Sequence, residues 1–367
     1  MRVYHILPTM VYGDAVSNDT RAINTLLVQR LGLHCRIYAQ NIAPGLADTL
    51  VWPLGALPET MPDDLLIYHL STGGALNEQL AHMAGHKLII YHNITPPEFF
   101  EPYDKNAAAL TREGYAQAAM LAAHAEYCIA DSAYNASELR RLGYTCPIDV
   151  VPILIPFEDY KRAPDPKVIE KYQDGRTNIL FVGRIAPNKR QEDVIRAFDC
   201  YRRTYDKTAR LFLVGSFGPE DRYYHDLRHY VRALGAKNVI FPGHISFAEI
   251  LGYYAAGSAF LCMSDHEGFC VPLVEAMCFG VPVAAKNTTA VGDTLGGGGL
   301  LLPDADPMTA AAALRRLLTD DALKSQILAG QQQRLADFAY EKVAGQFLAS
   351  FDKFLAAARQ KEQAGLV

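Results

Sequence analysis

The sequence lacks several features that mark particular classes of protein. Its seven cysteines are scattered and include no C-x-x-C pair, which argues against a disulfide framework and against a zinc site, and favours a reducing compartment. No apolar run reaches the roughly 20 residues of a membrane-spanning helix, so we expect any membrane contact to be peripheral. The net charge of −5 gives no indication of a nucleic-acid partner. No G-x-G-x-x-G follows a predicted strand, which disfavours a nicotinamide dehydrogenase.

What is present is the composition of a soluble globular enzyme. Half of the 367 residues are hydrophobic and a fifth are charged, and the length suits two domains of roughly 150–200 residues. Residues 1–158 contain nine Lys or Arg and sixteen Asp or Glu, whereas the remainder contains twenty-six and twenty-four and is the more basic part. Residues 1–7 have the character of a strand and not of a signal peptide, so we expect a cytoplasmic protein.

Strand-like apolar runs alternate with helix-like runs along the whole chain. In the first half we predict strands at 3–7, 34–39, 64–68, 87–91 and 126–130. The helices there are predicted from a cap at Asn18 or Asp19 to Arg30, and at 106–124 and 134–142, with an irregular, proline-rich stretch at 48–62. In the second half we predict strands at 178–182, 210–214, 239–241, 259–263, 281–284 and 300–302. Helices are predicted at 191–203, 220–233 and 247–256 and from Pro272 onward, a glycine loop is predicted at 296–299, and three more helices close the chain near Arg359. Such alternation predicts parallel sheets with helices on both faces.

A proline-rich segment separates the two halves of this pattern. Residues 151–156, followed by Pro164 and Pro166, resist both helix and central strand, which predicts an interdomain linker. We therefore divide the chain into domains at 1–156 and 157–345 and a C-terminal helical segment at 346–367. The predicted fold class is α/β, with two doubly wound domains whose ligands bind beyond the carboxyl ends of the strands.

One stretch, residues 264–283, combines several signals (S-D-H-E-G-F-C-V-P-L-V-E-A-M-C-F-G-V-P-V). It follows a buried apolar run, and Pro272 predicts that a helix opens there. The backbone N–H groups of Phe269, Cys270 and Val271 would then point out of a helix N-terminus. Such an N-terminus is an anion site suited to phosphate.

Two carboxylates flank this predicted anion site. Glu267, beside the flexible Gly268, would repel phosphate, so we expect it to bind a neutral polyol. Glu275, eight residues further on, can reach the same opening. One carboxylate for sugar hydroxyls and one for a ribose diol would suit a nucleotide sugar. Two glutamates at this spacing are nevertheless common by chance, and most glutamates are solvated surface residues, so the spacing alone assigns no function.

The whole stretch, over about twenty contiguous positions, resembles the E-x7-E signature of retaining GT-B glycosyltransferases of family four. That family includes many bacterial mannosyl- and glucosyltransferases. The resemblance implies the GT-B fold, in which two Rossmann-like domains face each other across a cleft and the last helix crosses back to the first domain.

The resemblance also implies a reaction. A hexose would move from a nucleotide-diphosphate sugar to an acceptor hydroxyl with retention of the anomeric configuration. Transfer would occur on the front face of the sugar, because Glu267 would be engaged with sugar hydroxyls and poorly placed to attack. The leaving phosphate would take the acceptor proton. We expect no cofactor and no metal ion bridging the phosphates.

The segment at 181–189 (F-V-G-R-I-A-P-N-K) is the next strongest signal. Arg184 and Lys189 flank a turn after a predicted strand, where two cations can hold a diphosphate. Solvated surface cations are the alternative reading. Because the pattern also resembles the family's diphosphate clamp, we interpret both residues as donor-binding and as catalytic through stabilisation of the leaving group.

His92 ends a predicted strand of the first half, just before a Pro-Pro loop. A lone histidine is often a structural residue, but loops at strand ends frequently carry function. In the family, a histidine at the corresponding place lies near the reacting sugar. We therefore count His92 with Glu267, Arg184 and Lys189 as a candidate catalytic residue, which would orient or polarise the sugar and would not act as the base.

The remaining candidates are weaker. Gly13 would let the backbone approach a phosphate or sugar. The family's Gly-Gly pair is absent there, so we weigh donor contact from this loop and acceptor contact by Asp14 equally. His244 follows a strand where the family often holds the nucleobase, and His266 could bind a sugar hydroxyl or simply pack. We read Asp131-Ser132 as a helix cap and the aromatic loop at 96–103 as buried packing in preference to acceptor or membrane contact.

The donor and acceptor are the least determined features. The resemblance favours GDP-mannose as the donor, and UDP-hexoses remain open. It implies a glycan or lipid-linked glycan acceptor in cell-surface polysaccharide synthesis, at the inner face of the plasma membrane. Two rival functions remain. One is a sugar-nucleotide epimerase of similar fold, and the other is a non-catalytic sugar-binding module.

Overall fold

The computed structural model describes residues 2–46 and 50–363. Parts of the predicted irregular stretch 48–62 and of the predicted segment 346–367 lie outside the described residues, as does Met1. The chain forms two compact units. Unit 1 comprises Met1–Glu101, Lys105–Pro156 and Phe338–Val367, and unit 2 comprises Pro102–Asp104 and Phe157–Asp337. The boundaries that we predicted from the sequence lie after residue 156 and after residue 345. In the structure, unit 1 leaves off at Pro156 and resumes at Phe338.

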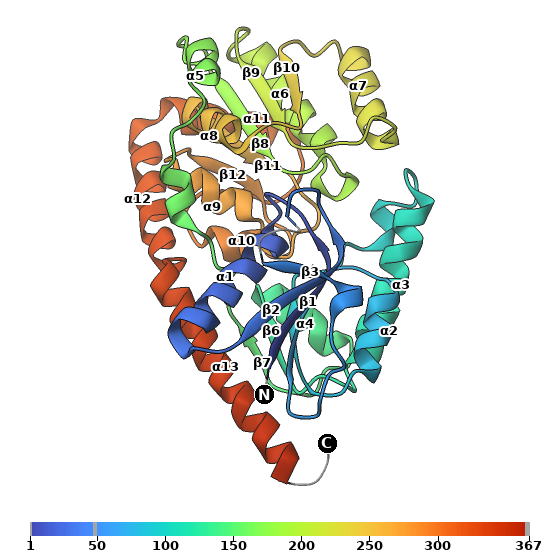
Figure 1. Ribbon diagram of the computed structural model, residues 1–367. Coiled ribbons are helices and arrows are strands. Elements are labelled where there is room, and N and C mark those ends of the chain that lie inside the picture. The colour runs from blue at the N-terminus through green and yellow to red at the C-terminus, as the bar shows by residue number, and fades with distance from the viewer. Residues whose placement is uncertain (1, 47–49, 364–367) are drawn as a thin grey trace. The chain divides into compact units, whose positions relative to one another are not determined.

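Unit 1 is built on a seven-stranded sheet with the order β3-β2-β1-β4-β5-β6-β7. Figure 1 labels β1, β2, β3, β6 and β7 of this sheet. All neighbouring strands are parallel. The strands are β1 (Val3–Met10), β2 (Cys35–Ile42), β3 (Val51–Pro53), β4 (Leu65–Leu70), β5 (His86–Tyr91), β6 (Tyr127–Ala130) and β7 (Ile148–Val150). The order changes direction between β1 and β4, which is where ligands bind in open sheets of this type.

Helices cover both faces of the unit 1 sheet. They are α1 (Ala15–Leu31), α2 (Ala75–His82), α3 (Lys105–Leu121), α4 (Ala133–Arg141) and α13 (Tyr340–Gln363), with 3-10 turns η1 (Leu54–Ala56) and η2 (Pro97–Phe99). Leu65 and Ile67 of β4 pack in one core, and Leu66 and Tyr68 pack in the other. Because both faces are buried, the strands are almost continuously apolar.

The C-terminal helix α13 belongs to unit 1, as the sequence predicted. Val343, Phe347, Phe351 and Phe354 recur at helical spacing and pack in the same core as α1 and the strands. The rings of Phe347 and Phe351 stack with centroids 6.1 Å apart. This buried stripe holds α13 on the sheet.

Unit 2 repeats the architecture with a six-stranded parallel sheet of order β10-β9-β8-β11-β12-β13. Its strands are β8 (Asn178–Val182), β9 (Arg210–Val214), β10 (Val239–Gly243), β11 (Ala259–Cys262), β12 (Val283–Lys286) and β13 (Leu300–Leu302). Its helices are α5 (Pro166–Tyr172), α6 (Gln191–Thr204), α7 (Arg222–Leu234), α8 (Phe247–Ala256), α9 (Val271–Cys278), α10 (Val291–Leu295), α11 (Pro307–Thr319) and α12 (Asp321–Asp337), with turns η3 (Phe157–Lys161) and η4 (Pro187–Lys189). The predicted α/β class with two doubly wound sheets is confirmed.

Several predicted boundaries were wrong for local reasons. Helix α1 begins at Ala15 because the Asp14 carboxylate accepts the Ser17 N–H at 3.0 Å, so Asn18 and Asp19 lie inside the helix. Helix α5 lies in the segment predicted to be linker, since Asp165 caps it and Pro166 takes its first position. Helix α2 and the short strands β3 and β7 were not predicted, because their runs are too short for a clear period.

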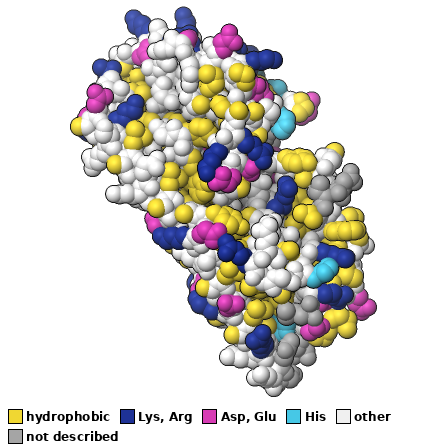
Figure 2. Space-filling model, turned by 60° about the vertical axis from the view of Figure 1, so that its left-hand side comes forward, with side chains coloured by type: hydrophobic (Ala, Val, Ile, Leu, Met, Phe, Trp, Pro, Cys, Tyr) yellow, Lys and Arg dark blue, Asp and Glu magenta, His cyan; other side chains and the backbone are white. Residues whose placement is uncertain are grey.

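Within residues 2–46 and 50–363, we find no helix that combines the length and the apolar character needed to cross a bilayer. On the face shown in Figure 2, charged side chains of both signs are interspersed with apolar ones.

A buried aspartate before β4 gives a test of unit 1 stability. Asp64 accepts hydrogen bonds from the backbone and guanidinium of Arg2 and from the Met61 N–H. Burial raises the pKa of Asp64, but these hydrogen bonds outweigh it, so the pKa lies below its ordinary value. The stabilisation is therefore complete above about pH 4 and is lost as the pH falls through the lowered folded-state pKa.

We expect Asp64→Asn to lower the free energy of unfolding at pH 7 by about 1–3 kcal/mol, because the N–H groups of Arg2 and Met61 lose a charged acceptor. Urea denaturation of both proteins would measure this. The difference should shrink below about pH 4, where the Asp64 carboxylate of the unfolded chain becomes protonated, and it should be smallest below the lowered pKa of the folded protein. Equal stabilities at pH 7 would contradict the assignment.

Candidate active site

Two loops of unit 2 carry most of the predicted site residues. The first follows β8 and contains Gly183, Arg184 and the turn η4. The second follows β11 and leads into α9. Strands β8 and β11 are neighbours, and the strand order changes direction between them. Open α/β sheets bind ligands at this position.

Lys189 of the first loop and Glu267 of the second form an ion pair. The Lys189 Nζ lies 2.6 Å from Glu267 Oε2, and the two side chains are 22% and 7% exposed. Burial lowers the pKa of Lys189, but the attraction of the Glu267 carboxylate outweighs it, so the pKa is raised. The pair therefore places a fixed cation beside an oxygen acceptor at the switch point of the sheet.

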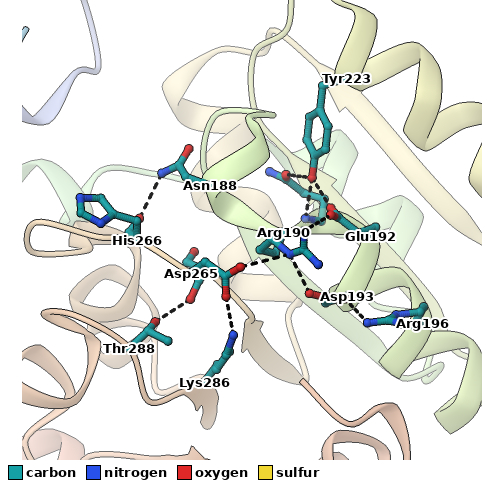
Figure 3. A network of polar contacts seen from close by, with 12 residues as sticks. Asn188, Arg190, Glu192, Asp193, Arg196, Tyr223, Asp265, His266, Lys286 and Thr288 are labelled. Carbon is teal, nitrogen blue, oxygen red and sulfur yellow. Dashed lines mark hydrogen bonds and ion pairs between the residues drawn. The ribbon is translucent and has the colours of Figure 1, made fainter. Parts of the chain in front are cut away.

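The loop that carries Glu267 is held through its backbone (Figure 3). Hydrogen bonds join it to η4 on one side and to the segment after β12 on the other. They run from Asn188 Nδ2 to His266 O (3.0 Å), from Asp265 N to Asn188 O (2.9 Å), from Thr288 Oγ1 to Ser264 O (2.6 Å) and from Glu267 N to Thr289 Oγ1 (2.9 Å). These contacts fix the backbone around Glu267 and leave its carboxylate to interact through Lys189.

A charge network that the sequence analysis missed reinforces these loops. Asp265 forms ion pairs with Lys286 and with Arg190, whose Nε lies 3.4 Å from Oδ2 (Figure 3). Arg190 also pairs with Glu192 at 2.8 Å and with Asp193 at 2.9 Å. The position of Asp265 just before the His-Glu pair was the available sequence signal, but its partners come from other elements.

The N-terminus of α9 has an unusual cap. Helix α9 begins at Val271, so Pro272 is its second residue and not its first as predicted. Cys270 is the cap residue, in the left-handed region with φ 73° and ψ 64°, and its side chain makes no capping bond. Non-glycine residues in this conformation are strained and cluster at functional sites. Among the described residues, the N–H groups of Cys270 and Val271 have no hydrogen-bond partner, so they can bind an anion.

Arg184 is anchored by its backbone and presents its side chain to solvent. Gly183 donates its N–H to Val214 O at 2.9 Å, and the Arg184 carbonyl accepts Gln191 Nε2 at 3.0 Å. The Arg184 side chain is exposed and makes no hydrogen bond or ion pair with any residue that the structure describes. Its guanidinium is therefore available to a ligand.

Glu275 lies in α9 with both carboxylate oxygens engaged. The Tyr160 hydroxyl donates to Oε1 at 2.8 Å, and the Tyr254 hydroxyl donates to Oε2 at 2.6 Å. Burial raises the pKa of Glu275, and the two hydroxyls offset part of that rise. Each oxygen keeps a further lone pair, so a diol can bind beside a tyrosine hydroxyl or replace it.

We expect Glu275→Ala to weaken binding of the donor nucleotide roughly 10- to 100-fold, because hydrogen bonds to a charged acceptor would be lost. Turnover at saturating donor should change much less. Titration calorimetry with the nucleoside diphosphate would measure the affinity. Tyr254→Phe is the matched control, since it removes a neighbouring hydroxyl and keeps the carboxylate. An unchanged affinity in Glu275→Ala would count against a ribose contact.

The two predicted histidines of unit 2 differ in exposure. His244 is exposed directly after the edge strand β10, two strands away from β8. His266 is buried next to Glu267, and its carbonyl accepts the Asn188 amide. The structure therefore brings together Lys189, His266, Glu267 and the start of α9, and it places His244 at the sheet edge.

The remaining predicted residues lie in unit 1. Gly13 is exposed with φ 72°, and Asp14 accepts both the N–H and the hydroxyl of Ser17 as the cap of α1. Ser132 caps α4, as predicted for the Asp131-Ser132 pair.

The side chain of His92, directly after β5, is buried. Its Nδ1 lies 2.9 Å from Asp131 Oδ2, and its Nε2 lies 2.9 Å from His69 Nδ1. Burial lowers the pKa of His92, but the Asp131 carboxylate outweighs it and the pKa is raised. Both ring nitrogens are thus engaged within unit 1, and the predicted contact with the donor sugar stays a prediction.

The part of the chain that carries the unit 2 candidate residues matches a model of a known protein family. Residues 176–320 match the family model of group 1 glycosyl transferases. The matched region contains Arg184, Lys189, Glu267 and Glu275. It covers less than half of the chain.

Curated relatives match over a similar region. A glycogen synthase of Mycobacterium tuberculosis is 29% identical over 201 residues, which is 54% of this chain and 47% of the relative. The O-antigen chain mannosyltransferase B of Escherichia coli is 26% identical over 187 residues, which is 50% of this chain and 48% of the relative. The chain thus spans about half the length of the curated relatives it matches.

Solved structures match over nearly the whole chain. Sucrose-phosphate synthase from Thermosynechococcus elongatus superposes with a TM-score of 0.75 at 19% identity, covering 97% of this chain and 100% of that one. Anabaena Alr3699/HepE in complex with UDP and glucose gives 0.75 at 18%, covering 96% and 100%. At these identities the likeness shows the fold, and the predicted GT-B fold is confirmed.

Proposed function

We propose that this protein is a retaining glycosyltransferase. It would transfer a hexosyl group from a nucleotide-diphosphate sugar to a hydroxyl of a glycan or lipid-linked glycan in cell-surface polysaccharide synthesis. The observation that carries the proposal is the Lys189–Glu267 pair, at 2.6 Å, at the switch point of the unit 2 sheet. The match of residues 176–320 to group 1 glycosyl transferases supports it.

Each part of the donor has a matching group in this site. The diphosphate would bind the exposed Arg184, Lys189 and the N–H groups of Cys270 and Val271, which supply positive charge from side chains and peptide dipoles. Glu267 would accept hydrogen bonds from sugar hydroxyls, and Glu275 would accept them from the ribose. When the diphosphate enters, Lys189 is shared between phosphate and carboxylate.

The same groups would accelerate the reaction. Negative charge grows on the leaving diphosphate in the transition state, and fixed cations and amides aimed at that charge lower the barrier. The departing phosphate oxygen would take the proton of the acceptor hydroxyl on the same face of the sugar. Because the protein itself supplies this positive charge, the proposal requires neither a cofactor nor a metal ion at the phosphates.

GDP-mannose is our first choice of donor. The named mannosyltransferase relatives support a mannosyl donor, including the serotype-specific mannosyltransferase WbdA of Escherichia coli, which is 23% identical over 206 residues. A UDP-hexose is our second choice, which the solved complex of Alr3699/HepE with UDP-glucose supports. We propose a cytoplasmic protein in peripheral contact with the inner face of the membrane.

A thermal-shift screen of nucleotide sugars tests the donor. A donor present at 100 times its Kd adds about 2.7 kcal/mol to the apparent stability, so the true donor should stand out from its analogues. We expect GDP-mannose to give the largest shift. No shift with any GDP- or UDP-sugar would contradict the proposal. Incubation of the best donor without acceptor then separates the rivals, since an epimerase would interconvert the sugar and a transferase would not.

A further inference from the structure

Three histidines and an aspartate form a continuous chain across the sheet of unit 1. His5 lies in β1, His69 in β4, His92 at the end of β5 and Asp131 after β6, and these four strands are neighbours. His5 Nδ1 lies 3.1 Å from His69 Nε2, and His69 Nδ1 lies 2.9 Å from His92 Nε2. His92 Nδ1 in turn lies 2.9 Å from Asp131 Oδ2. All four side chains are buried.

A second carboxylate faces this chain from helix α1. Asp19 is 3% exposed, and its Oδ1 accepts the Leu154 N–H at 2.8 Å. One oxygen of Asp19, one nitrogen of His69 and one nitrogen of His92 all lie within 4.8 Å of one another. Among the described residues, no Lys or Arg pairs with Asp19 or Asp131. Two buried carboxylates thus lack a permanent cation, which is a costly arrangement.

We propose that Asp19, His69 and His92 bind one divalent transition-metal ion of the class of Zn²⁺ or Co²⁺. Imidazole nitrogens and a carboxylate oxygen are ligands that these ions prefer. Ligand atoms in a tetrahedral site with bonds of about 2.0–2.1 Å lie about 3.4 Å apart. The His69–His92 separation of 2.9 Å must therefore open slightly, and any contact near the 4.8 Å limit must close. A water molecule would complete the coordination.

The surroundings of the three ligands favour this assignment. Metal-bound histidines usually donate the proton of their other ring nitrogen to a carboxylate or another acceptor. With His92 Nε2 and His69 Nδ1 on the metal, His92 Nδ1–H donates to Asp131 and His69 Nε2–H donates to His5 Nδ1. The Leu154 N–H orients Asp19 in the same way. Each ligand thus already has the outer partner that a metal site requires.

The part of the chain that the structure describes contains one competing set of ligand atoms. Cys262, Glu267 and Cys270 in unit 2 also lie within 4.8 Å of one another. There the carboxylate is already neutralised by Lys189 at 2.6 Å, whereas Asp19 has no such cation. The unit 1 site uses none of the groups assigned to the diphosphate, and His92 is the one predicted catalytic residue among its ligands.

Cobalt titration of the full-length, chelator-stripped protein tests the proposal. We expect one Co²⁺ per chain, with the visible spectrum of nitrogen and oxygen ligation and without a thiolate charge-transfer band. Asp19→Asn should weaken binding beyond 10-fold, and Asp131→Asn, which acts through His92, should weaken it roughly 10- to 100-fold. Cys270→Ser and the exposed His34→Gln are matched controls that should bind as the wild type does.

Several results would overturn the proposal. They are failure of the wild type to retain Co²⁺ through gel filtration, a thiolate band that Cys270→Ser removes, or full affinity in Asp19→Asn. If Asp19→Asn does not fold, His69→Gln replaces it. For the wild type, Zn²⁺ should raise Tm and a chelator should reverse the rise. None of these readouts uses sugar transfer, so their failure leaves the proposed function to its own tests.

Discussion

Glu267→Gln should reduce glycosyl transfer to background, a loss of at least roughly 1000-fold. Glutamine keeps the size of the side chain but removes the charge that would accept hydrogen bonds from sugar hydroxyls and pair with Lys189. The backbone of this loop is held by Asn188, Thr288 and Thr289, which do not use the Glu267 carboxylate, so the fold should persist. Initial rates with donor and acceptor, alongside circular dichroism, would measure both effects.

The control for this variant is Glu158→Gln. Glu158 lies in the same unit and also forms a Lys–Glu ion pair, with Lys161. Its side chain is 84% exposed, so this pair lies on the surface and not in the candidate site. Its activity should be unchanged. Full activity in purified, folded Glu267→Gln would show that the Glu267 carboxylate is not needed for transfer and would contradict the proposed sugar contact.

Lys189→Ala should have the second largest effect, and it should act on both rate and stability. The rate should fall by roughly 100- to 1000-fold, because a cation is lost from the growing charge of the leaving diphosphate. The free energy of unfolding should fall by about 3 kcal/mol, since Glu267, 7% exposed, is left without its partner. Initial rates and urea denaturation would measure the two losses.

A double variant separates these two roles of Lys189. Lys189→Ala combined with Glu267→Ala removes both charges, so much of the stability should return while activity stays at background. Lys161→Ala, whose side chain is 69% exposed, is the matched control and should change neither quantity appreciably. If Lys189→Ala were fully active, the diphosphate would not bind at this turn.

Most long elements of the fold were predictable, because their apolar runs are buried on both sheet faces or carry a helical stripe. Strand β8 and helix α8 begin and end where they were predicted. Strands β3 and β7 and helix α2 were not predicted, because their residues form neither a continuous apolar run nor a clear helical period. The start of α1 was misplaced because several polar residues in succession can each cap a helix.

The sequence indicated individual candidate residues but not the contacts between them. Lys189 and Glu267 came from separate motifs, and their contact depends on β8 and β11 being neighbours, which only the sheet order determines. Tyr160 and Tyr254 bind Glu275 from 115 and 21 residues away, and no local pattern predicts such pairs. The chain from His5 to Asp131 is similar, because its members come from four strands and share no spacing.

A crystal structure with bound nucleoside diphosphate, GDP first and UDP second, examines the proposed site most directly. We predict that its phosphates contact Arg184, Lys189 and the N–H groups of Cys270 and Val271, with the ribose at Glu275. Well-ordered nucleotide at any other place on the molecule, with the Lys189–Glu267 pair undisturbed, would contradict the proposed donor site.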